Sequence, residues 1–475
     1  MNPIDLTIFI VYLLAMLGVG FYFLRKNESV EDYYVGGRKM SSLHIGLSVV
    51  ATDVGGGFSI GLGGLGFAIG IAGSWMLFTG LIGAWLSAVL LIPRVFKVLK
   101  LKPLLTFPEL FGHFFDRRVA LLAGIISAIG YLGFTSAQIL AGAKLATATF
   151  PSMDLDQAIL IMGITAVVYT VFGGLKAVIY TDTFQWLLLM GGLIFIGIPL
   201  GYTAIGGWSG IKDTLDPSFL DIWNIEWQQL VNWGVTIIPI WFIAMTLYQR
   251  IYASRDEKTA RKAWYIAGIF EWPIMAFMGV LLGLFARVAI QQGMFESIGY
   301  SEVSQMDSEM GLPVLLRTIL PVGLMGLMMS AYFSAIMSTA DSCLMAASGN
   351  VVTDIIGFFR KISEKSSLRY SQIATFLIGV VALLLALTMT NVLELMLLSY
   401  SFMVSGLLVP LLGALFYKRR KSSAALASMI TGGSVTLTLE ILKKESLIQM
   451  PLGLDPNIFG ILMALIVYII VLNKK

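Results

Sequence analysis

The stretch VVATDVGGGFSIG, residues 49–61, carries one aspartate and three consecutive glycines inside a strongly apolar part of the chain. A glycine costs about 1 kcal/mol relative to alanine in a helix interior. An ionised aspartate in the hydrocarbon of a membrane is costlier still. We therefore predict that Asp53 and the glycines at 55–57 mark an unwound segment of a membrane helix, and that this segment lines a buried site for an ion and a solute.

The rest of the composition is that of an integral membrane protein. Of the 475 residues, 57% are hydrophobic and only 13% are charged, which leaves no room for a sizeable soluble domain. Apolar runs of about 20 residues, long enough to cross a bilayer as helices, recur along the whole chain. We predict an all-α membrane protein of one domain, residues 1–475, with thirteen spans centred near residues 14, 57, 85, 133, 165, 190, 243, 275, 332, 380, 404, 433 and 464.

Basic residues predict how these spans are oriented. With the N-terminus outside, almost every Lys and Arg, Arg250 included, falls at an inward end or loop, as the positive-inside rule requires. The outward side keeps only Lys212, Arg287, Lys443 and Lys444. We predict a multi-pass protein of the cell (inner) membrane with a cytoplasmic C-terminus. The net charge of +4 then reflects the basic residues on the inner side of the membrane and does not indicate nucleic-acid binding.

Few residues favour enzymatic chemistry. The single cysteine, Cys343, cannot form an intramolecular disulfide, and the two histidines, His44 and His113, are far apart in sequence. No Cys/His spacing is typical of a zinc or haem site. We expect a protein that is not an enzyme, that contacts the lipid bilayer and a small-molecule solute, and that needs no obligate protein partner.

Two helix breaks predict an internal repeat. The second span is interrupted at residues 55–57, and five spans later Gly234 and Pro239 interrupt another apolar run. Proline removes a backbone donor and clashes with the preceding turn, so we expect a kink or break near Pro239. Transporters often contain two inverted repeats that each open with a broken helix. We predict an extra first helix (1–40), a first repeat (41–205), a second repeat (230–420) and two additional helices (421–475).

The ninth span, within SAIMSTADSCLMAASGNVVTD, carries the clearest polar stripe. Helical spacing places Ala335, Ser338, Thr339 and Ser342 on one face, with Asp341 beside it. Sodium is a hard cation that prefers oxygen ligands, which hydroxyls and freed carbonyls supply. Hydroxyls in membrane helices also bond back to carbonyls or link helices.

Further acids lie outside this stripe. Asp182, between two threonines at the start of the sixth span, is either an ion ligand or an interfacial acid. The long external loop of residues 291–311 contains Glu296, Glu302, Asp307 and Glu309. It is either part of an outer gate or a solvated connection.

The chain resembles the sodium:solute symporter family, whose members transport proline, sialic acid, sugars and choline. The resemblance extends from about Leu6 to Arg420 and rests on DYYVGGRKM, FPELFGHFFDRR, GGLKAVIYTDTFQ, YQRIYASRDEKTARKA, FSAIMSTADSCLMAASG and YSFMVSGLLVPLLGALF. It implies a leucine-transporter-like fold of two inverted five-helix repeats.

The resemblance also implies site residues. For a main sodium site these are the carbonyls of Ala51, Val54 and Ala335 and the hydroxyls of Ser338 and Thr339. It implies a possible second ion site at Asp182, Ser338, Asp341 and Ser342, although Asp341 stands where two-sodium members have serine. Asp53 matches an aspartate of the proline permease branch, and we expect it to couple ion and solute. By position, the solute candidates are Gly56, Gly57, Ser59, Phe78, Tyr131, Gln138, Trp241, Tyr248 and Tyr400.

We predict a sodium-coupled symporter that imports a small organic solute by alternating access, with sodium as the coupling ion. An amino acid, amine or similar zwitterion is favoured, because Asp53 can offset a positive group and the predicted pocket lacks a cation for an acidic solute. Proton coupling and transport of a sugar or carboxylate are the open alternatives. A channel or a transporter-like sensor is a weaker one.

Overall fold

The structure is a computed structural model that describes residues 2–24, 40–53, 55–150, 152–360 and 364–474. Side chains are described in these ranges apart from those of residues 16–17, 19–24, 53, 55–56, 172–181, 364–365 and 367–368. This part of the chain is helical throughout, without a named strand, and one isolated parallel bridge joins Met40 to Ser254. An all-α fold was predicted and is confirmed.

The helices of the first half are α1 (Pro3–Leu24), α3 (Ser42–Asp53), α4 (Gly55–Ile69), α5 (Trp75–Leu86), α6 (Ile92–Leu99), α7 (Pro108–Phe114), α8 (Arg117–Thr149), α9 (Leu155–Gly192), α10 (Ile198–Ala204) and α11 (Gly207–Thr214). Those of the second half are α12 (Trp227–Ile243), α13 (Met245–Ala253), α14 (Glu257–Ile269), α15 (Ala276–Gln291), α16 (Gly311–Ile319), α17 (Leu324–Gly349), α18 (Gly357–Phe359), α19 (Glu364–Ala386), α20 (Val392–Phe416), α21 (Ser422–Lys444) and α22 (Pro456–Asn473). Short 3-10 and π segments join or extend them: η2 (Gly70–Ser74), η3 (Ser87–Leu91), η4 (Leu193–Gly197), η5 (Pro217–Leu220), η6 (Phe270–Met275), η7 (Glu296–Ile298), η8 (Val303–Gln305), η9 (Ser308–Met310), η10 (Asn350–Ile356) and η11 (Pro451–Gly453).

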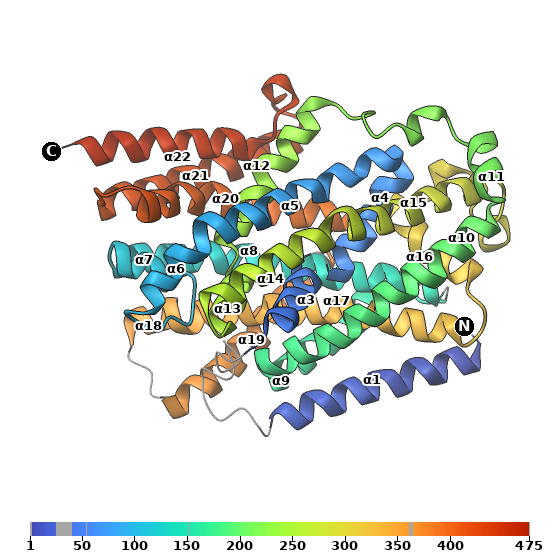
Figure 1. Ribbon diagram of the computed structural model, residues 1–475, viewed down its shortest axis with the longest axis horizontal. Coiled ribbons are helices and arrows are strands. Elements are labelled where there is room, and N and C mark those ends of the chain that lie inside the picture. Colours follow the sequence, from blue (N-terminus) through green and yellow to red (C-terminus); the bar gives the residue numbers. More distant parts are fainter. Residues whose placement is uncertain (1, 25–39, 54, 151, 361–363, 475) are drawn as a thin grey trace.

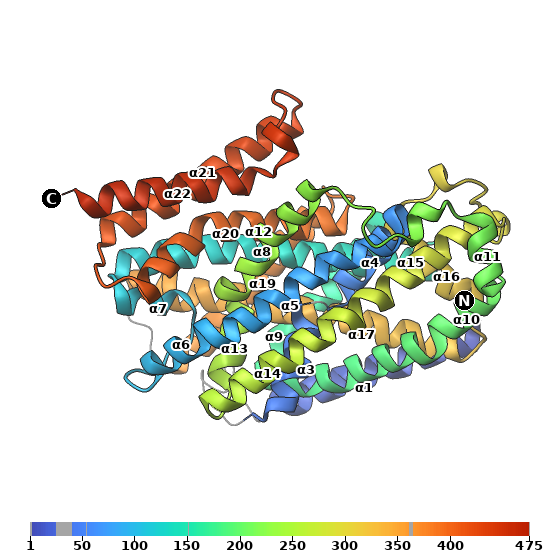
Figure 2. The ribbon, with the colours of Figure 1, turned by 45° about the horizontal axis from the view of Figure 1, so that its top comes forward.

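The long helices lie side by side along the long axis of the molecule, and the two termini lie at opposite ends of that axis (Figure 1). Helix α17 is at the centre, where it packs against α1, α3, α4, α8 and α9. Its residues from Met328 to Gly349 are all buried. Helices α21 and α22 pack together at one edge of the bundle (Figure 2).

Several of these helices begin at a side chain that satisfies the free amide groups of the first turn. Asp116 accepts hydrogen bonds from the backbone of Arg118 and Val119 at the start of α8. Asp154, Asp256 and Asn391 cap α9, α14 and α20 in the same way. Such caps stabilise a helix by about 1 kcal/mol each, and they end the loops at defined positions.

The predicted number of thirteen spans is not confirmed. Among the described residues, nine helices are long and apolar enough to cross a membrane, or ten if the bent pair α12 and α13 forms one span. The shorter apolar helices are Pro3–Ala15, Ser42–Thr52 and Leu155–Val171. One reason for the difference is that predicted spans run together, as in the continuous segment Gly57–Leu99. There the 3-10 segment η2 begins at Gly70, whose φ of +71° lies in the left-handed region, and a Cβ at this position would meet the Phe219 carbonyl.

Helix α9 is also longer than one span, and its contacts show that it reverses direction. Thr170 contacts Asp341 of α17, whereas Asp182 contacts Ser338. In a straight helix Thr170 and Asp182 would be about 18 Å apart, but their partners are separated by only about 4.5 Å of helix. Farther along α9, Gly192 packs against Met328 of α17. The chain therefore turns between Thr170 and Asp182 and runs antiparallel to α17 afterwards.

The second helix break lies at Ala244, five residues after the predicted position at Pro239. Pro239 is inside α12, and α12 and α13 meet at 41° around the extended residue Ala244. Two phenols satisfy the backbone groups that this break frees. The Thr246 amide donates to the Tyr131 hydroxyl at 3.0 Å, and the Tyr248 hydroxyl donates to the Phe242 carbonyl at 2.9 Å. These partners explain why the break occurs at Ala244 and not at the proline.

The first break is shorter than predicted. Helix α3 ends at Asp53 and α4 begins at Gly55, so only Val54, outside the described residues, separates them. The three glycines form the first turn of α4 instead of an unwound segment. A close contact explains the third one: a Cβ at Gly57 would lie 2.5 Å from Gln138 Oε1.

Candidate ion and solute site

The ion site that the sequence predicts lies where α3 crosses α17. The Thr339 hydroxyl is 3.0 Å from the Ala51 carbonyl of α3 and 3.1 Å from the Ala335 carbonyl of its own helix. A hydroxyl has one proton, so it satisfies one of the two carbonyls at a time. Three oxygen atoms therefore converge with more lone pairs than protons, which is an arrangement that suits a cation.

Of the other two predicted ligands of this site, only Ser338 is described. Ser338 directs its hydroxyl to Asp182 Oδ1. Val54 lies outside the described residues, and neither the Asp53 side chain nor the surroundings of Gly56 are described.

Arg250 is a site residue that was not predicted from the sequence. Its position suggested one of the charges at the inner ends of the spans, but the side chain is fully buried within the bundle. Its Nη2 atom lies 2.7 Å from Thr52 Oγ1, 2.8 Å from Ser342 Oγ and 3.5 Å from Asp182 Oδ2. Ser48 links the same groups, because its hydroxyl donates to Asp182 Oδ2 at 2.7 Å and accepts from Arg250.

One sequence signal could have found Arg250. It precedes the charged loop at Arg255 by five residues, which places it about 7.5 Å inside a helix of 1.5 Å rise per residue. A buried arginine needs an acidic partner. Asp182 is the only carboxylate that forms an ion pair with it among the described residues.

The residues predicted for a second ion site are divided between two places. Asp182 and Ser342 surround the Arg250 guanidinium. Asp341 faces another way: Oδ1 accepts a hydrogen bond from Thr170, and Oδ2 has no hydrogen-bond partner in the described part of the chain. It borders a cavity of about 60 Å³ between α1, α9 and α17, lined among others by Leu13, Thr165 and Met337.

Three of the solute candidates come together beside the start of α4. Gly57 packs against the Gln138 amide of α8, and Gln138 Nε2 lies 3.7 Å from the Met396 sulfur of α20. Gln138 Oε1 is buried, with no partner among the described atoms. Tyr400 of α20 stacks on Phe134 with a ring separation of 5.0 Å. This region offers a buried amide between aromatic and apolar walls, which is typical of a small-molecule site.

Two other candidates, Tyr131 and Tyr248, lie at the break between α12 and α13. Both hydroxyls bind backbone groups there, and Tyr131 also lies 2.9 Å from Thr246 Oγ1. The Tyr248 ring packs 4.5 Å from that of Phe107. These contacts indicate that Tyr131 and Tyr248 stabilise the break.

The remaining candidates have mainly packing contacts. Phe78 lies between Trp75 and Trp272, at ring separations of 5.0 and 5.1 Å. Trp241 is buried against Gly83 and Trp264. Ser59 is buried where α4 packs against α15.

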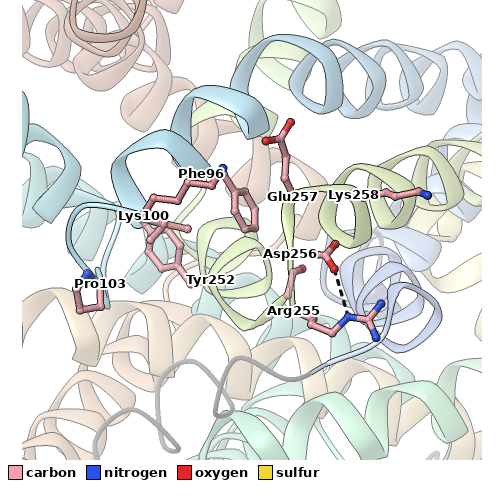
Figure 3. Close-up of a pocket in the computed structure, with 10 residues that line it drawn as sticks. Phe96, Lys100, Pro103, Tyr252, Arg255, Asp256, Glu257 and Lys258 are labelled. Atoms are coloured by element: carbon pink, nitrogen blue, oxygen red, sulfur yellow. Dashed lines mark hydrogen bonds and ion pairs between the residues drawn. The ribbon is translucent and has the colours of Figure 1, made fainter.

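A larger cavity of about 440 Å³ opens between α6 and the α13–α14 connection (Figure 3). Its wall combines Phe96 and Tyr252 with charged groups that include Lys100, Arg255 and Asp256. Hydrogen bonds from Thr259 at the start of α14 hold the pKa of Asp256 below its ordinary value. None of the predicted ion or solute residues lines this cavity, so it is separate from the crossing of α3 and α17.

Carboxylates, histidines and cysteines do not form a metal centre in the described ranges, since no three of them cluster there. The ion chemistry available at the crossing is thus that of hydroxyl and carbonyl oxygens, with carboxylates nearby. Such ligands suit a weakly held monovalent cation.

Known proteins that are similar to this chain are transporters. The sequence model of the sodium:solute symporter family matches residues 33–432. The osmoregulated proline transporter OpuE of Bacillus subtilis is 27% identical, over 90% of this chain and 87% of its own length. The sodium/pantothenate symporter of Escherichia coli is 24% identical, over 97% of this chain and 94% of its own.

A solved structure shows the same fold. The substrate-bound, outward-open state of a Na+-coupled sialic acid symporter superposes with a TM-score of 0.80 at 22% identity, over 99% of this chain and 98% of that one. The fold is leucine-transporter-like, as the resemblance implied. Because the family match spans most of the chain, this protein belongs to the sodium:solute symporter family, and sodium is its coupling ion.

Proposed function

We propose that this protein imports a small organic solute, favoured to be an amino acid, amine or related zwitterion, by sodium-coupled alternating access. One observation carries the ion part of the proposal. The Thr339 hydroxyl meets the carbonyls of Ala51 and Ala335 across the α3–α17 crossing. A sodium ion at this point would hold two helices of different repeats together.

In this mechanism sodium is bound by the carbonyls of Ala51, Val54 and Ala335 and by the hydroxyls of Ser338 and Thr339. The Ser338 hydroxyl, which bonds to Asp182 in this structure, turns toward the ion. A ligand shifts a conformational equilibrium only by its difference in affinity between the states. Ligands divided between α3 and α17 supply that difference, because separating the two helices dismantles the site.

The carboxylates take different parts. We propose that Asp53 couples the ion to the solute from the end of α3. Asp182 holds Arg250 and competes with sodium for the Ser338 hydroxyl. A second ion site at Asp182, Asp341 and Ser342 requires Arg250 to leave Ser342.

The solute is proposed to bind against Gly57, Gln138 and Tyr400, next to Gly56. The Gln138 amide supplies hydrogen bonds there, and Phe134 and Met396 supply apolar walls. Asp53 would offset a positive group of a zwitterion. Proline and pantothenate, the solutes in the names of two relatives, differ in chemistry, so membership of the family leaves the solute class to experiment.

Thermal unfolding of the purified protein tests this proposal. Amino acids, amines, sugars and carboxylates are added in sodium chloride and, in parallel, in potassium chloride. A ligand at 100 times its dissociation constant stabilises a protein by about 2.7 kcal/mol. We expect a zwitterion to raise the unfolding temperature in sodium only. Equal stabilisation in both salts would contradict sodium coupling and favour a proton, and stabilisation by sugars or carboxylates alone would replace the solute class.

We also propose the arrangement around this site. Residues 41–205 and 230–420 form two inverted repeats, each opening with an interrupted helix. The protein is a multi-pass component of the cell membrane with its N-terminus outside and its C-terminus in the cytoplasm. In support, the termini lie at opposite ends of the bundle (Figure 1). Its relatives are transporters, and we assign it no enzymatic reaction.

A further inference from the structure

Helix α17 carries both predicted hydroxyl ligands of sodium, but it does not cap its own start. The residue at its N-cap is Gly323, which has no side chain to satisfy the free amides of the first turn. The φ of Gly323 is +90°, in the left-handed region where residues other than glycine are strained. A side chain that caps this helix must therefore come from another part of the chain.

Asp5 of α1 supplies the cap. Its Oδ1 atom accepts hydrogen bonds from the amide of Gly323 at 2.7 Å and from that of Gly326 at 2.8 Å, although these residues are 318 and 321 positions away in sequence. Asp5 is only 1% exposed. A carboxylate is favoured at a helix N-terminus, and a buried one requires hydrogen-bond donors. The start of α17 and the start of α1 are thus tied to each other.

The two backbones also approach closely at this point. A Cβ at Gly326 would lie 2.6 Å from Asp5 Cα and 2.7 Å from the Asp5 carbonyl oxygen. Carbon atoms in favourable contact are about 3.5–4.0 Å apart, so a side chain at position 326 would force the helices apart. Small residues that permit such an approach are typical of helix pairs in membranes.

From this contact α1 follows α17 toward the ion site. The Phe9 ring packs edge to face on that of Phe333, with a ring separation of 5.3 Å. Leu13, one turn later, borders the cavity of about 60 Å³ that Met337 and Ser338 also line. Because the contacts advance in the same direction on both helices, α1 and α17 run parallel. Helix α1 lies along the edge of the bundle (Figure 1).

These contacts fix the position of α17 in two ways. Asp5 fixes the helix along its axis, and Phe9 and Leu13 fix its rotation. The Thr339 hydroxyl must face the Ala51 carbonyl of α3 for the oxygen atoms of the ion site to converge. A shift of α17 by one residue would rotate the helix by about 100° and turn this hydroxyl away from α3.

We propose that Asp5 is a positioning residue for sodium binding: by capping α17 from α1, it holds this helix where its hydroxyls face the ion. The inference rests on the proposed sodium ligands, because it concerns the same helix. The apparent dissociation constant of a ligand rises as the fraction of molecules in the binding-competent arrangement falls. Without the cap α17 reaches other positions, and sodium binds more weakly.

Sodium titration of the purified protein tests this role. The unfolding temperature is measured against sodium concentration without solute, and potassium chloride keeps the ionic strength constant. We expect Asp5→Ala to raise the sodium concentration for half-maximal stabilisation about fivefold, as when the competent fraction falls to about one fifth. A parental sodium concentration would overturn the proposal, even if Asp5→Ala unfolds at a lower temperature, because the cap would then be structural only.

Asp256→Ala is the matched control for the loss of a cap. Asp256 accepts a hydrogen bond of 2.7 Å from the Thr259 amide of α14, the helix that it precedes directly. Its replacement should lower the unfolding temperature and leave the half-maximal sodium concentration unchanged. A shift as large as that in Asp5→Ala would show that any lost cap weakens sodium binding, and would overturn a specific role of Asp5.

Gly326→Ala breaks the same contact without altering the carboxylate. Its methyl group would meet the Asp5 backbone, so we again expect the half-maximal sodium concentration to rise about fivefold. Gly191→Ala in α9 is the control, because a Cβ there meets nothing within 4 Å. Parental sodium binding in Gly326→Ala, or an equal shift in Gly191→Ala, would overturn the proposal. This pair also tests it if Asp5→Ala does not fold.

The double variant Asp5→Ala with Gly326→Ala tests whether both changes act through one contact. Its shift in sodium concentration should then be smaller than the product of the two single shifts. A shift equal to that product would show independent effects and would overturn the proposal.

Thr339→Val separates this inference from the proposed sodium ligands. If Thr339→Val weakens sodium binding and Asp5→Ala does not, the ligands stand and the positioning role of Asp5 is wrong. If Thr339→Val leaves sodium binding unchanged, the ligand set is wrong and the inference fails with it.

Discussion

Thr339 and Ser338 are neighbours on α17, yet their hydroxyls face different partners. Thr339 bridges to the Ala51 carbonyl of α3, and Ser338 binds the Asp182 carboxylate of α9. Adjacent residues on a helix point about 100° apart, so one helix can address two neighbours at once. In the proposed mechanism, an ion at the crossing would affect α9 through the Ser338 hydroxyl.

The Thr339 hydroxyl gives the first prediction. Thr339→Val keeps the shape of the side chain but removes the oxygen that faces both carbonyls. We expect the sodium concentration for half-maximal uptake to rise about tenfold, since a lost ligand costs on the order of 1.4 kcal/mol. Uptake at saturating sodium should change much less. The measurement is solute uptake as a function of sodium concentration.

The control is Thr375→Val in α19. Thr375 is buried and bonds to a carbonyl four residues earlier, as Thr339 does, but this hydrogen bond stays within its own helix. Its sodium dependence should match that of the parent protein. If Thr339→Val also retained the parental sodium dependence, Thr339 would be removed from the ion site.

Arg250 supports a second prediction at this scale. Arg250→Met leaves Asp182 buried without its cation, which should lower the free energy of unfolding by about 3–5 kcal/mol. The double variant Arg250→Met with Asp182→Asn removes both charges and should be more stable than Arg250→Met alone. Chemical unfolding in detergent gives both values.

The exposed pair Arg255–Asp256 provides the comparison. Arg255 is 74% exposed in it, so Arg255→Met should alter the stability by less than about 1 kcal/mol. A double variant no more stable than Arg250→Met would show that the charge of Asp182 is not what Arg250 compensates.

Contacts between residues on the same helix face could be predicted from the sequence, because helical spacing fixes which residues are neighbours. Ala335 and Thr339 share a face because they are four residues apart, and the structure brings them together with Ala51. It missed Arg250, since an arginine near the end of a span looks like an interfacial charge until its distant partner is known. The sequence also could not predict which partner the Ser338 hydroxyl would bind, because Ala51 and Asp182 are both distant from it in sequence.

At the scale of helices, the break between α12 and α13 depends on side chains from elsewhere. Because the helix is interrupted at Ala244, the Thr246 amide does not bond to the carbonyl four residues earlier, that of Phe242, and donates to the Tyr131 hydroxyl of α8 instead. A buried amide without a partner costs about 1–3 kcal/mol. The break is therefore stabilised by another helix as well as by Tyr248 of α13 itself.

Tyr131→Phe tests that dependence. Without the hydroxyl the Thr246 amide is left unpaired, so the free energy of unfolding should fall by about 1–3 kcal/mol. The apparent affinity for the solute should change by less than the stability does. Unfolding and solute titration are measured on the same preparation, with Tyr265→Phe as the control, because the Tyr265 side chain is only half-buried. Unchanged stability with weakened solute affinity would instead make Tyr131 a solute contact.

The position of this break shows the limit of local sequence signals. Proline predicts where a helix can tolerate an interruption, and Pro239 is only five residues away. The interruption forms where outside partners exist, and Tyr131 is more than 100 residues distant. The glycines at 55–57 show the converse, because glycine fits both an unwound segment and a first helical turn that packs closely against Gln138.

At the scale of the whole molecule, hydropathy predicts the helical membrane fold well and the number of spans less well. The reversal of α9 between Thr170 and Asp182 agrees with two separate passes around residues 165 and 190. Continuous helical turns such as η2 join other passes, so helix length no longer marks each crossing. Hydropathy identifies segments that are apolar and long enough to cross the membrane. The direction in which the chain runs in α9 is known only from its contacts with α17.

Orientation in the membrane gives the final prediction. Lys212 of α11 and Lys258 of α14 are both exposed and lie in connections that the charge distribution places on opposite sides. We expect Lys212→Cys, in a Cys343→Ser background, to react with an impermeant maleimide on intact cells, because it lies on the side with few basic residues. Lys258→Cys should react only after the membrane is permeabilised, since Arg255, Arg261 and Lys262 share its side. The reverse pattern would contradict the predicted orientation and invert the topology.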